Sequence, residues 1–273
     1  MKSSFLSLPA NAKGRDIFVG DVHGEISMLE LGLGALGFDP AVDRLVSVGD
    51  LVDRGENSFA VLDLYAGSPW FHAVLGNHEA MVEAAVSGAE RAAVMALQNG
   101  AEWLTGIQAA GRRKVATTIA GMPLALEIRH PAGHTVGVVH AEVRSKARWE
   151  QVRTADLKSR DVLDPSQRRM ASSLLWGRRR HRQMNLFLMG RFLPSRASEP
   201  DEVPGIDLII SGHNILRAPR DPRLEGNCLC IDTGAFEPDG RLTFVDLMSN
   251  RYLQVCRLGA GPELYVRPLR PLA

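Results

Sequence analysis

The hydrophobic and polar positions in the first part of the chain follow a regular order. Three short apolar runs, rich in β-branched and aromatic residues, are each followed by glycine and polar residues: Asp16–Gly20, Leu45–Val48 and Phe71–Leu75. Such runs are typical of buried strands. Two predicted helices lie between them. In the first, Ile26, Leu29, Leu33 and Leu36 recur at helical spacing, and the second lies around Asn57–Tyr65. The order strand–helix–strand–helix–strand predicts an α/β fold.

Helical patterns continue after this region. Ala80–Gln98 is rich in Ala, Met, Val and Glu and is predicted to be a helix interrupted at Gly88. At positions 164–165 an acidic N-cap residue precedes a proline, which is a typical helix start, and this helix is expected to run to about Trp176. Arg191–Gly205 contains three prolines and is expected to form an irregular loop.

Further apolar runs predict strands in the second half. They are Val136–Val139, Asp207–Ser211, Cys228–Asp232, Arg241–Leu247, Arg251–Leu258 and Glu263–Leu269. Turns separate the later runs, so we expect a mostly antiparallel meander there. Because candidate ligand side chains occur in both halves, we expect one domain spanning residues 1–273.

The composition is that of an ordinary globular protein and excludes several classes. Of 273 residues, 45% are hydrophobic and 23% charged, so the chain is long enough to bury a substantial core. The net charge of +1 gives no overall field that favours nucleic acid or an anionic membrane. No apolar run approaches the ~18 residues of a membrane span, and Ser7 and Pro9 interrupt the N-terminal apolar stretch, which argues against a secretory signal. We therefore expect a soluble, cytoplasmic protein with no membrane or nucleic-acid partner, whose three cysteines are reduced and buried.

The stretch Gly49–Gly55 (Gly-Asp-Leu-Val-Asp-Arg-Gly) places two carboxylates and a guanidinium where a predicted strand ends. Ligand sites in open α/β sheets collect at the carboxyl ends of strands. The alternative is a surface turn that uses Asp and Gly for backbone geometry alone.

Five predicted strands end in side chains of the types that bind metals: Asp21, His23, Asp50, Asn77, His140 and His213. Asp21 and His23 lie two apart, so on an extended segment they point the same way and can bind one ion. Asn77 and His78 are adjacent and point apart, which leaves one of them for another role. Mixed oxygen and imidazole ligation suits Mn, Fe or Zn better than Mg or Ca, and Asp50 can bridge two ions, as in two-metal hydrolytic sites. Each residue alone has a structural explanation, but their recurrence after separate strands favours a metal site.

Several of these segments resemble a known family. Gly20–Gly24, Gly49–Gly55 and Gly76–Glu79 resemble the three signature blocks of the phosphoprotein phosphatase family, within the calcineurin-like metallophosphoesterases. Residues 139–141, 211–213 and 231–234 resemble its later blocks, and the likeness covers about Asp16–Leu247. It is strongest to the short bacterial and phage-type serine/threonine phosphatases. The resemblance implies a β-sandwich of two mixed sheets flanked by helices, and a phosphoric ester hydrolase with two divalent ions, expected to be Mn, with Fe or Zn as alternatives.

The resemblance also implies a role for each matching residue. The first ion would bind Asp21, His23 and Asp50, and the second Asp50, Asn77, His140 and His213. Arg54 and Arg178 would bind phosphoryl oxygens. His78 would be the general acid, oriented by Asp53. A hydroxide bridging the ions would attack phosphorus directly, with phosphoserine or phosphothreonine in proteins, or a small phosphorylated compound, as the substrate.

Two positions depart from the family pattern. Leu75 stands where protein-directed members usually carry a phosphate-binding arginine, and a leucine there is typical of the diadenosine tetraphosphate hydrolase branch. Dinucleoside polyphosphate hydrolysis is therefore the alternative function, although that branch usually lacks the aspartate supplied here by Asp53. Asn214 replaces a threonine that commonly follows the Gly-His pair. A non-catalytic binding module is a third hypothesis, which the complete ligand set and His78 argue against.

Arg178–Arg182 is a run of basic residues with two interpretations. The run attracts an acidic substrate or a polyphosphate, or it is a solvated helix end or loop in which Arg178 alone turns inward; we favour the second. Trp103 and Trp149 are interpreted as packing residues rather than as the wall of a substrate groove.

Overall fold

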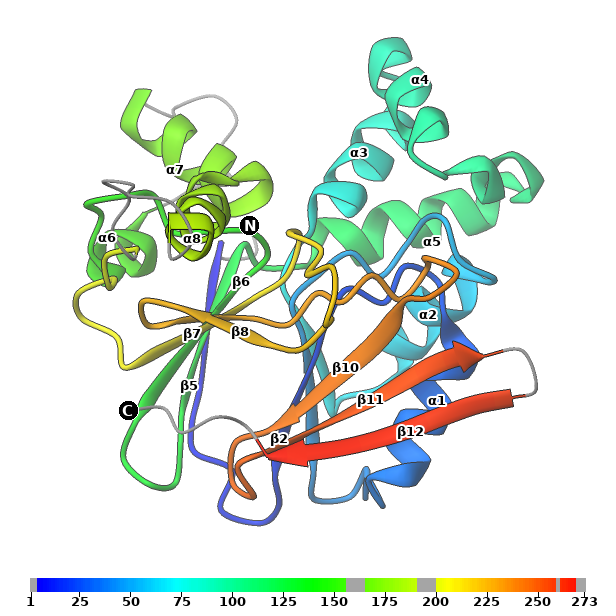
Figure 1. The fold of residues 1–273 in the computed structure, drawn as a ribbon. Helices are drawn as coiled ribbons and strands as arrows, with labels where there is room; N and C mark the ends of the chain where they lie inside the picture. The colour runs from blue at the N-terminus through cyan, green and yellow to red at the C-terminus, as the bar shows by residue number, and fades with distance from the viewer. Residues whose placement is uncertain (1–3, 156–164, 191–199, 259–260, 269–273) are drawn as a thin grey trace.

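Two six-stranded sheets, packed face to face, form the centre of the computed structural model, which describes residues 4–155, 165–190, 200–258 and 261–268 (Figure 1). The first sheet has the strand order β1 (Phe5–Leu8), β5 (Ala125–Arg129), β6 (Thr135–Val139), β7 (Leu208–Ser211), β9 (Cys228–Cys230) and β8 (Arg223–Glu225). The second has the order β12 (Gly261–Pro268), β11 (Arg251–Leu258), β10 (Arg241–Asp246), β2 (Asp16–Val19), β3 (Arg44–Ser47) and β4 (Phe71–Ala73). Each sheet contains both parallel and antiparallel pairs, so the predicted mixed α/β fold is confirmed.

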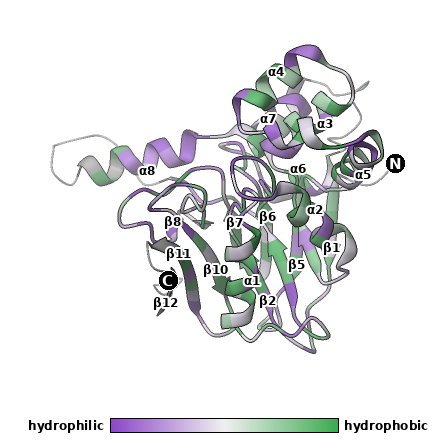
Figure 2. Cartoon of the chain, turned by 90° about the vertical axis from the view of Figure 1, so that its right-hand side faces the viewer, coloured by the Kyte–Doolittle hydropathy of each residue, from purple (hydrophilic) through white to green (hydrophobic). Residues whose placement is uncertain are grey.

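The helices lie on the outer faces and at one end of the two sheets. On the second sheet lie α1 (Ile26–Ala35) and α2 (Ser58–Gly67). One further group is formed by α3 (Asn77–Val86), α4 (Glu90–Gln98), a 3-10 turn at Glu102–Gly106 and α5 (Ala109–Ala120). A second group, beside the end of the first sheet, is formed by α6 (Trp149–Thr154), α7 (Pro165–Trp176) and α8 (Arg179–Gly190) (Figure 1). Figure 2 shows hydrophobic residues along the strands and hydrophilic residues over the first turns of α8.

Side chains of the parallel strands are buried on both faces of each sheet. Phe18 on β2 packs into the core between the sheets, with Val46 and Leu126, whereas Ile17 and Val19 pack outward into the core under the helices. Strands buried on both faces are apolar throughout rather than alternating. This is why the first strands stand out in the sequence as short continuous apolar runs.

The parallel pairs bring several loops to one edge of the sandwich. In the second sheet Val19 pairs with Ser47, which pairs in turn with Ala73, and in the first sheet Val138 pairs with Ile210. The loops that carry the candidate ligands begin directly after these residues. Residues far apart in the sequence therefore meet at the carboxyl ends of the strands, where α/β sheets build their sites.

The second half is less antiparallel than its sequence predicts. Among the described strands, β10, β11 and β12 form the expected meander, but β6, β7 and β9 run parallel. A crossover that contains α6, α7 and α8 joins β6 to β7, and such a crossover allows two successive strands to run parallel. Three strands of the first sheet were not predicted: β5 and the two edge strands, β1 and β8. The short β1, Phe5–Leu8, includes the serine that made this stretch look interrupted.

Several local expectations are confirmed. The helix predicted around Asn57–Tyr65 is α2, and Asn57 caps it by accepting a hydrogen bond from the backbone N–H of Ala60. The predicted interruption at Gly88 is also present, since a left-handed Gly88 (φ 89°) separates α3 from α4. Trp149 is fully buried and packs in the core. The three cysteines are buried and form no disulfide. The expected N-cap at position 164 and most of the predicted loop Arg191–Gly205 lie outside the described residues.

Among the helices that the structure describes, none is both long enough and apolar enough to span a bilayer.

Replacing Gly32 by alanine should destabilise the protein, whereas replacing Gly34 in the same helix should stabilise it. In the interior of a helix, alanine is more favourable than glycine by about 1 kcal/mol, and this applies at both positions. A Cβ on Gly32 would overlap the ring of Phe244, and overpacking costs about 1–3 kcal/mol, whereas a Cβ on Gly34 meets no atom within 4 Å. Chemical denaturation of Gly32→Ala and Gly34→Ala measures both effects. A higher free energy of unfolding for Gly32→Ala would contradict the packing of α1 on β10.

Candidate metal centre

Five polar residues at the strand ends adopt left-handed backbone conformations. The φ angles are 46° at His23, 50° at Asp50, 72° at both Asp53 and Arg54, and 65° at His213. A positive φ is uncommon for residues other than glycine, and such strained residues cluster at functional sites, where the surrounding structure holds them in place. The polar loops after the strands thus contain five residues in this uncommon conformation.

Two glycines lie where a carboxylate oxygen closely approaches the backbone. A Cβ on Gly76 would overlap the Oδ1 atom of Asp50, and a Cβ on Gly212 would overlap the Oδ1 atom of Asp21. No other residue type lets the backbone approach these oxygens so closely. The glycines that precede Asn77 and His213 are therefore packing requirements of the site as well as turn formers.

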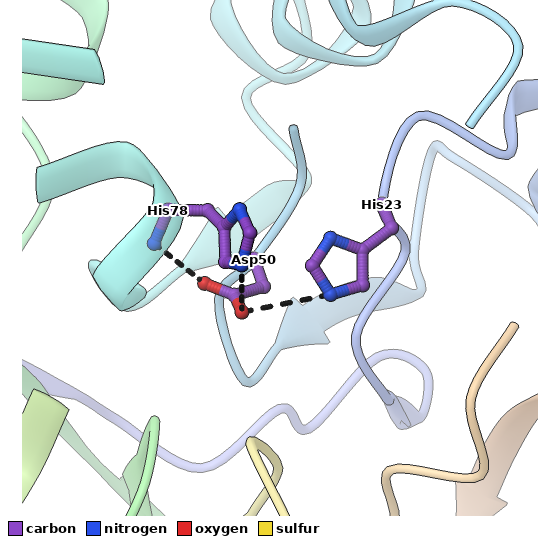
Figure 3. Close-up of side chains that lie close together, drawn as sticks. All are labelled: His23, Asp50 and His78. Atoms are coloured by element: carbon purple, nitrogen blue, oxygen red, sulfur yellow. Dashed lines mark hydrogen bonds and ion pairs between the residues drawn. The ribbon is translucent and has the colours of Figure 1, made fainter. Parts of the chain in front are cut away.

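Asp50 lies between the side chains of His23 and His78 (Figure 3) and also close to His140. One oxygen, Oδ2, lies 3.6 Å from His23 Nε2 and 3.9 Å from His78 Nε2. The other, Oδ1, accepts a 3.0 Å hydrogen bond from the backbone N–H of His78 and lies 3.4 Å from His140 Nε2. Burial alone would raise the pKa of Asp50, but the surrounding histidines, foremost His140, lower it below its ordinary value. Asp50 is therefore ionised and available to both sides of the cluster.

Two of these histidines have a defined tautomer. The Nδ1 of His23 lies 2.9 Å from the carbonyl oxygen of Val52, and the Nδ1 of His140 lies 3.0 Å from that of Val48. A carbonyl can only accept, so both Nδ1 atoms carry the hydrogen. Burial lowers the pKa of His23 to about 3 and also lowers the pKa of His140, so both rings are neutral. Their Nε2 atoms consequently present lone pairs to the cluster.

Around His140 the lone pairs of several acceptors converge. Its Nε2 lies 2.8 Å from Asn77 Oδ1 and 3.4 Å from Asp50 Oδ1, with no hydrogen available between them. The Nε2 of His213 is buried and has no hydrogen-bond partner among the described residues, and its ring lies 5.0 Å from that of His140. Buried acceptors facing one another are costly unless a cation lies between them. The donor set therefore fits a divalent metal ion held by nitrogen and oxygen ligands.

The ligand atoms form two groups that share Asp50. Within the described part of the chain, atoms within 4.8 Å of one another unite Asp50 with His140 and His213, and Asp50 with His23 and His78. Asp21 belongs to neither group. Its carboxylate accepts a hydrogen bond from the backbone N–H of His213 (3.0 Å from Oδ2) and lines the same cleft. The structure thus brings all six predicted ligands to one place, with His78 rather than Asp21 grouped with His23.

His78 also belongs to a buried chain of hydrogen bonds. Its Nδ1 lies 2.7 Å from Asp53 Oδ2, and the indole N–H of Trp103 donates to Asp53 Oδ1, also at 2.7 Å. Asp53 is fully buried, and burial raises its pKa, against the hydrogen bonds from His78 and Trp103. The carboxylate holds the ring so that its Nε2 faces Asp50. Trp103 was expected only to pack; the sequence carries no local signal for this contact, because the two residues lie 50 positions apart.

Glu79 supports the site by accepting hydrogen bonds from the backbone of two loops, a role that was not predicted from the sequence. Its Oε2 accepts from the backbone N–H groups of Asp50 and Gly76, both at 2.9 Å, and its Oε1 accepts from those of Leu51 and Val52, at 2.8 and 3.1 Å. Burial raises the pKa of Glu79 to about 8, while these donors favour the ionised form. One side chain thus ties the loop after β3 to the start of α3. The only signal was its place at the end of the Gly76–Glu79 block.

The two predicted phosphate-binding arginines line the same cleft of about 490 Å³. Arg54 donates to His23 Nε2 at 3.1 Å, and its guanidinium lies 4.3 Å from the ring centroid of Phe236. Phe236 also contacts the His23 ring edge-on at 4.9 Å and was not singled out from the sequence. Arg178 follows the end of α7, where the carbonyl of Gly177 accepts from the Asn214 side chain at 3.1 Å.

The basic run after Arg178 divides between several environments. Arg178 and His181 both line the cleft, so more than one of its residues turns inward. The guanidinium of Arg180 donates to the backbone carbonyl oxygens of Asp201 and Glu225, whereas Arg182 is exposed. The run is the start of a helix that is solvated on one side and faces the cleft on the other.

Comparisons with known proteins identify relatives of this chain. A family model described as calcineurin-like phosphoesterase matches residues 15–215. Serine/threonine-protein phosphatase 2 of Escherichia coli (strain K12) is 30% identical over 228 residues, which cover 83% of this chain and 89% of that protein. The symmetrical bis(5'-nucleosyl)-tetraphosphatase of Pseudomonas fluorescens (strain Pf0-1) is 45% identical over 74 residues, 27% of this chain and 25% of that protein. A solved protein serine/threonine phosphatase from Saccharomyces cerevisiae superposes with a TM-score of 0.60 over 97% of this chain and 83% of that one, and at 15% identity this likeness shows the fold alone.

Replacing Glu79 by glutamine should destabilise the protein by about 2–6 kcal/mol. The amide nitrogen would face two backbone N–H donors and leave both without an acceptor, and each buried unsatisfied donor costs about 1–3 kcal/mol. Chemical denaturation measures this loss, and Glu30→Gln, an exposed position on α1, is the matched control. Equal free energies of unfolding for the two variants would contradict the supporting role of Glu79.

Proposed function

Because the chain belongs to the calcineurin-like phosphoesterase family, we propose that it hydrolyses phosphomonoesters, with phosphoserine and phosphothreonine in proteins as its substrates. The observation that carries this proposal is the convergence of acceptor lone pairs from His140, Asn77 and Asp50 beside a His78–Asp53 pair. Such a donor set binds divalent cations, and the histidine pair is suited to proton transfer. The relative covered over most of its length, from Escherichia coli, is named a serine/threonine-protein phosphatase.

The family is dinuclear and metal-dependent, and we assign two ions to this cleft. Asp21, His23 and Asp50 would hold the first, and Asp50, Asn77, His140 and His213 the second. A pair of divalent ions, here Mn by preference for mixed oxygen and imidazole ligands, supplies a water of lowered pKa as nucleophile and neutralises charge on the phosphoryl oxygens.

The chain's own side chains would bind and protonate the substrate. Arg54 and Arg178 line the cleft, and each planar guanidinium can donate two parallel hydrogen bonds to phosphoryl oxygens. Arg54 now donates to His23 Nε2, so it must release that nitrogen when an ion occupies the site. His78 would donate a proton from Nε2 to the leaving oxygen, and Asp53 holds the opposite nitrogen.

Hydrolysis of dinucleoside polyphosphates is the second candidate function, and Leu75 is the observation that favours it. The leucine is 7% exposed and packs in the core, and its backbone N–H donates to the carbonyl oxygen of Pro123. A relative named bis(5'-nucleosyl)-tetraphosphatase matches over a quarter of the chain. Asp53 supports the first candidate instead, since it orients a general acid that a monoester with an alkoxide leaving group needs.

Replacing His78 by asparagine should lower kcat on a phosphoserine peptide by about 10²–10⁴-fold, the usual contribution of a general acid. The loss on p-nitrophenyl phosphate should be smaller, because its leaving oxygen needs no proton. Asp53→Asn should reduce kcat by about 10–100-fold, the usual effect of removing a supporting carboxylate. His134→Asn, at an exposed turn between β5 and β6, is the control. Wild-type turnover by His78→Asn with an unchanged metal content would exclude the assigned role of His78.

A comparison of rates on three substrates distinguishes the two candidate functions. The Mn-loaded protein should hydrolyse phosphoserine and phosphothreonine peptides with a higher kcat/KM than diadenosine tetraphosphate, with p-nitrophenyl phosphate as the reference. Release of nucleotides from diadenosine tetraphosphate by a protein that leaves phosphopeptides intact would establish the second candidate and exclude the first.

A further inference from the structure

A second groove, which we call the arginine groove, opens beside the catalytic cleft. It measures about 420 Å³ and is lined by Arg144, Arg168, Arg169, Ser172, Ser173 and Trp176. These residues come from the segment after β6 and from the last turns of α7. None of them is among the candidate metal ligands or the groups that would bind and protonate a phosphoryl group.

The charge of this part of the chain differs strongly from that of the whole. From Arg144 to Arg182 the sequence has twelve Lys and Arg residues against four Asp and Glu residues, a net charge of +8, whereas the whole chain carries +1 and the remainder therefore −7. The side chains of Arg144 and Arg169 are exposed. Within the described residues, neither guanidinium has a carboxylate partner within 4.0 Å, in contrast to Arg15, which pairs with Asp43 at 2.7 Å.

The arginine groove and the catalytic cleft share a wall. Trp176 lines both, is 42% exposed, and contacts the ring of His213 edge-on at 6.3 Å. The next residues in the chain are Gly177, which lines the groove, and Arg178, which lines the cleft. A ligand whose phosphoryl group lies at Arg178 therefore needs to extend only past the indole of Trp176 to reach the groove.

We propose that the arginine groove binds acidic residues that flank the phosphorylated residue of a protein substrate, so that the enzyme prefers phosphoserine and phosphothreonine in an acidic sequence. This inference rests on the proposed function. An extended peptide advances about 3.3 Å per residue, so a few acidic side chains can reach the separate guanidinium groups of Arg144 and Arg169. The two serines add hydrogen-bond partners for a peptide backbone. The groove is open, whereas a nucleoside is usually held in an enclosed apolar pocket.

The test compares two phosphoserine peptides that differ only in three flanking residues, all Asp in one and all Asn in the other. We expect the wild-type protein to hydrolyse the acidic peptide with the higher kcat/KM through a lower KM, and added salt to reduce the preference. In the double variant Arg144→Ser/Arg169→Ser the KM for the acidic peptide should rise about three- to tenfold, since exposed ion pairs contribute modestly. Its kcat and its rate on p-nitrophenyl phosphate should not change. Arg129→Ser, an exposed arginine at the end of β5, is the matched control and should behave as wild type.

Several outcomes would overturn the proposal, and they separate it from the proposed function. Equal kcat/KM values for both peptides in the wild type, or an unchanged preference in the double variant, refute the groove while leaving the protein phosphatase assignment intact. If neither peptide is hydrolysed but diadenosine tetraphosphate is, both fail. Loss of binding of a labelled single-stranded RNA in the double variant, without a change in the peptide preference, would identify the groove as a nucleic-acid surface instead.

Discussion

Buried acceptor atoms that face one another without a hydrogen between them are the constraint on which the cleft depends. His140 donates through Nδ1 to a backbone carbonyl, so its Nε2 must meet the oxygens of Asn77 and Asp50 as a lone pair. In a low-dielectric interior this arrangement is repulsive unless a cation lies between the groups. The fold thus pre-organises a cation site, and the repulsion lowers the free energy of unfolding. An ion that binds only the folded state offsets this loss.

The scaffold around these atoms resists the repulsion in two ways. Backbone groups fix the ligands: carbonyl oxygens orient two histidine rings, and the backbone N–H of His78 holds one oxygen of Asp50. The second way is the carboxylate of Glu79, which gathers four backbone N–H groups from two loops and keeps them in register. Left-handed conformations at His23 and Asp50 persist because these contacts over-determine them. The ligand positions are therefore set by the sheets, and the ligand side chains have little freedom to relax.

The sequence predicted the parts of this design that are local. A polar side chain after an apolar run, in most cases with a glycine, marks a strand end. Parallel strands bring such ends together, so the convergence of these side chains could be predicted without coordinates. Contacts between distant segments could not: the indole of Trp103 reaches Asp53 across 50 positions, and Phe236 reaches Arg54 from the far end of the chain. The parallel pairing of β6 with β7 was missed for the same reason, because a crossover of three helices separates the partners. The hydrophobic periodicity of a segment indicates which of its side chains are buried, but it does not indicate which other segment they pack against.

Net charge illustrates the same limit in electrostatic terms. A value of +1 for the whole chain suggests no field at all, yet it is the sum of +8 over residues 144–182 and −7 over the rest. Both signs of charge meet in the cleft, which is lined by the carboxylates of Asp21 and Asp50 and by the guanidinium of Arg178, and Trp176 separates it from the arginine groove. The carboxylates of the cleft attract cations, while its guanidinium groups attract anions. A phosphate ester is the kind of ligand that needs both, because its oxygens must meet metal ions on one side and arginines on the other.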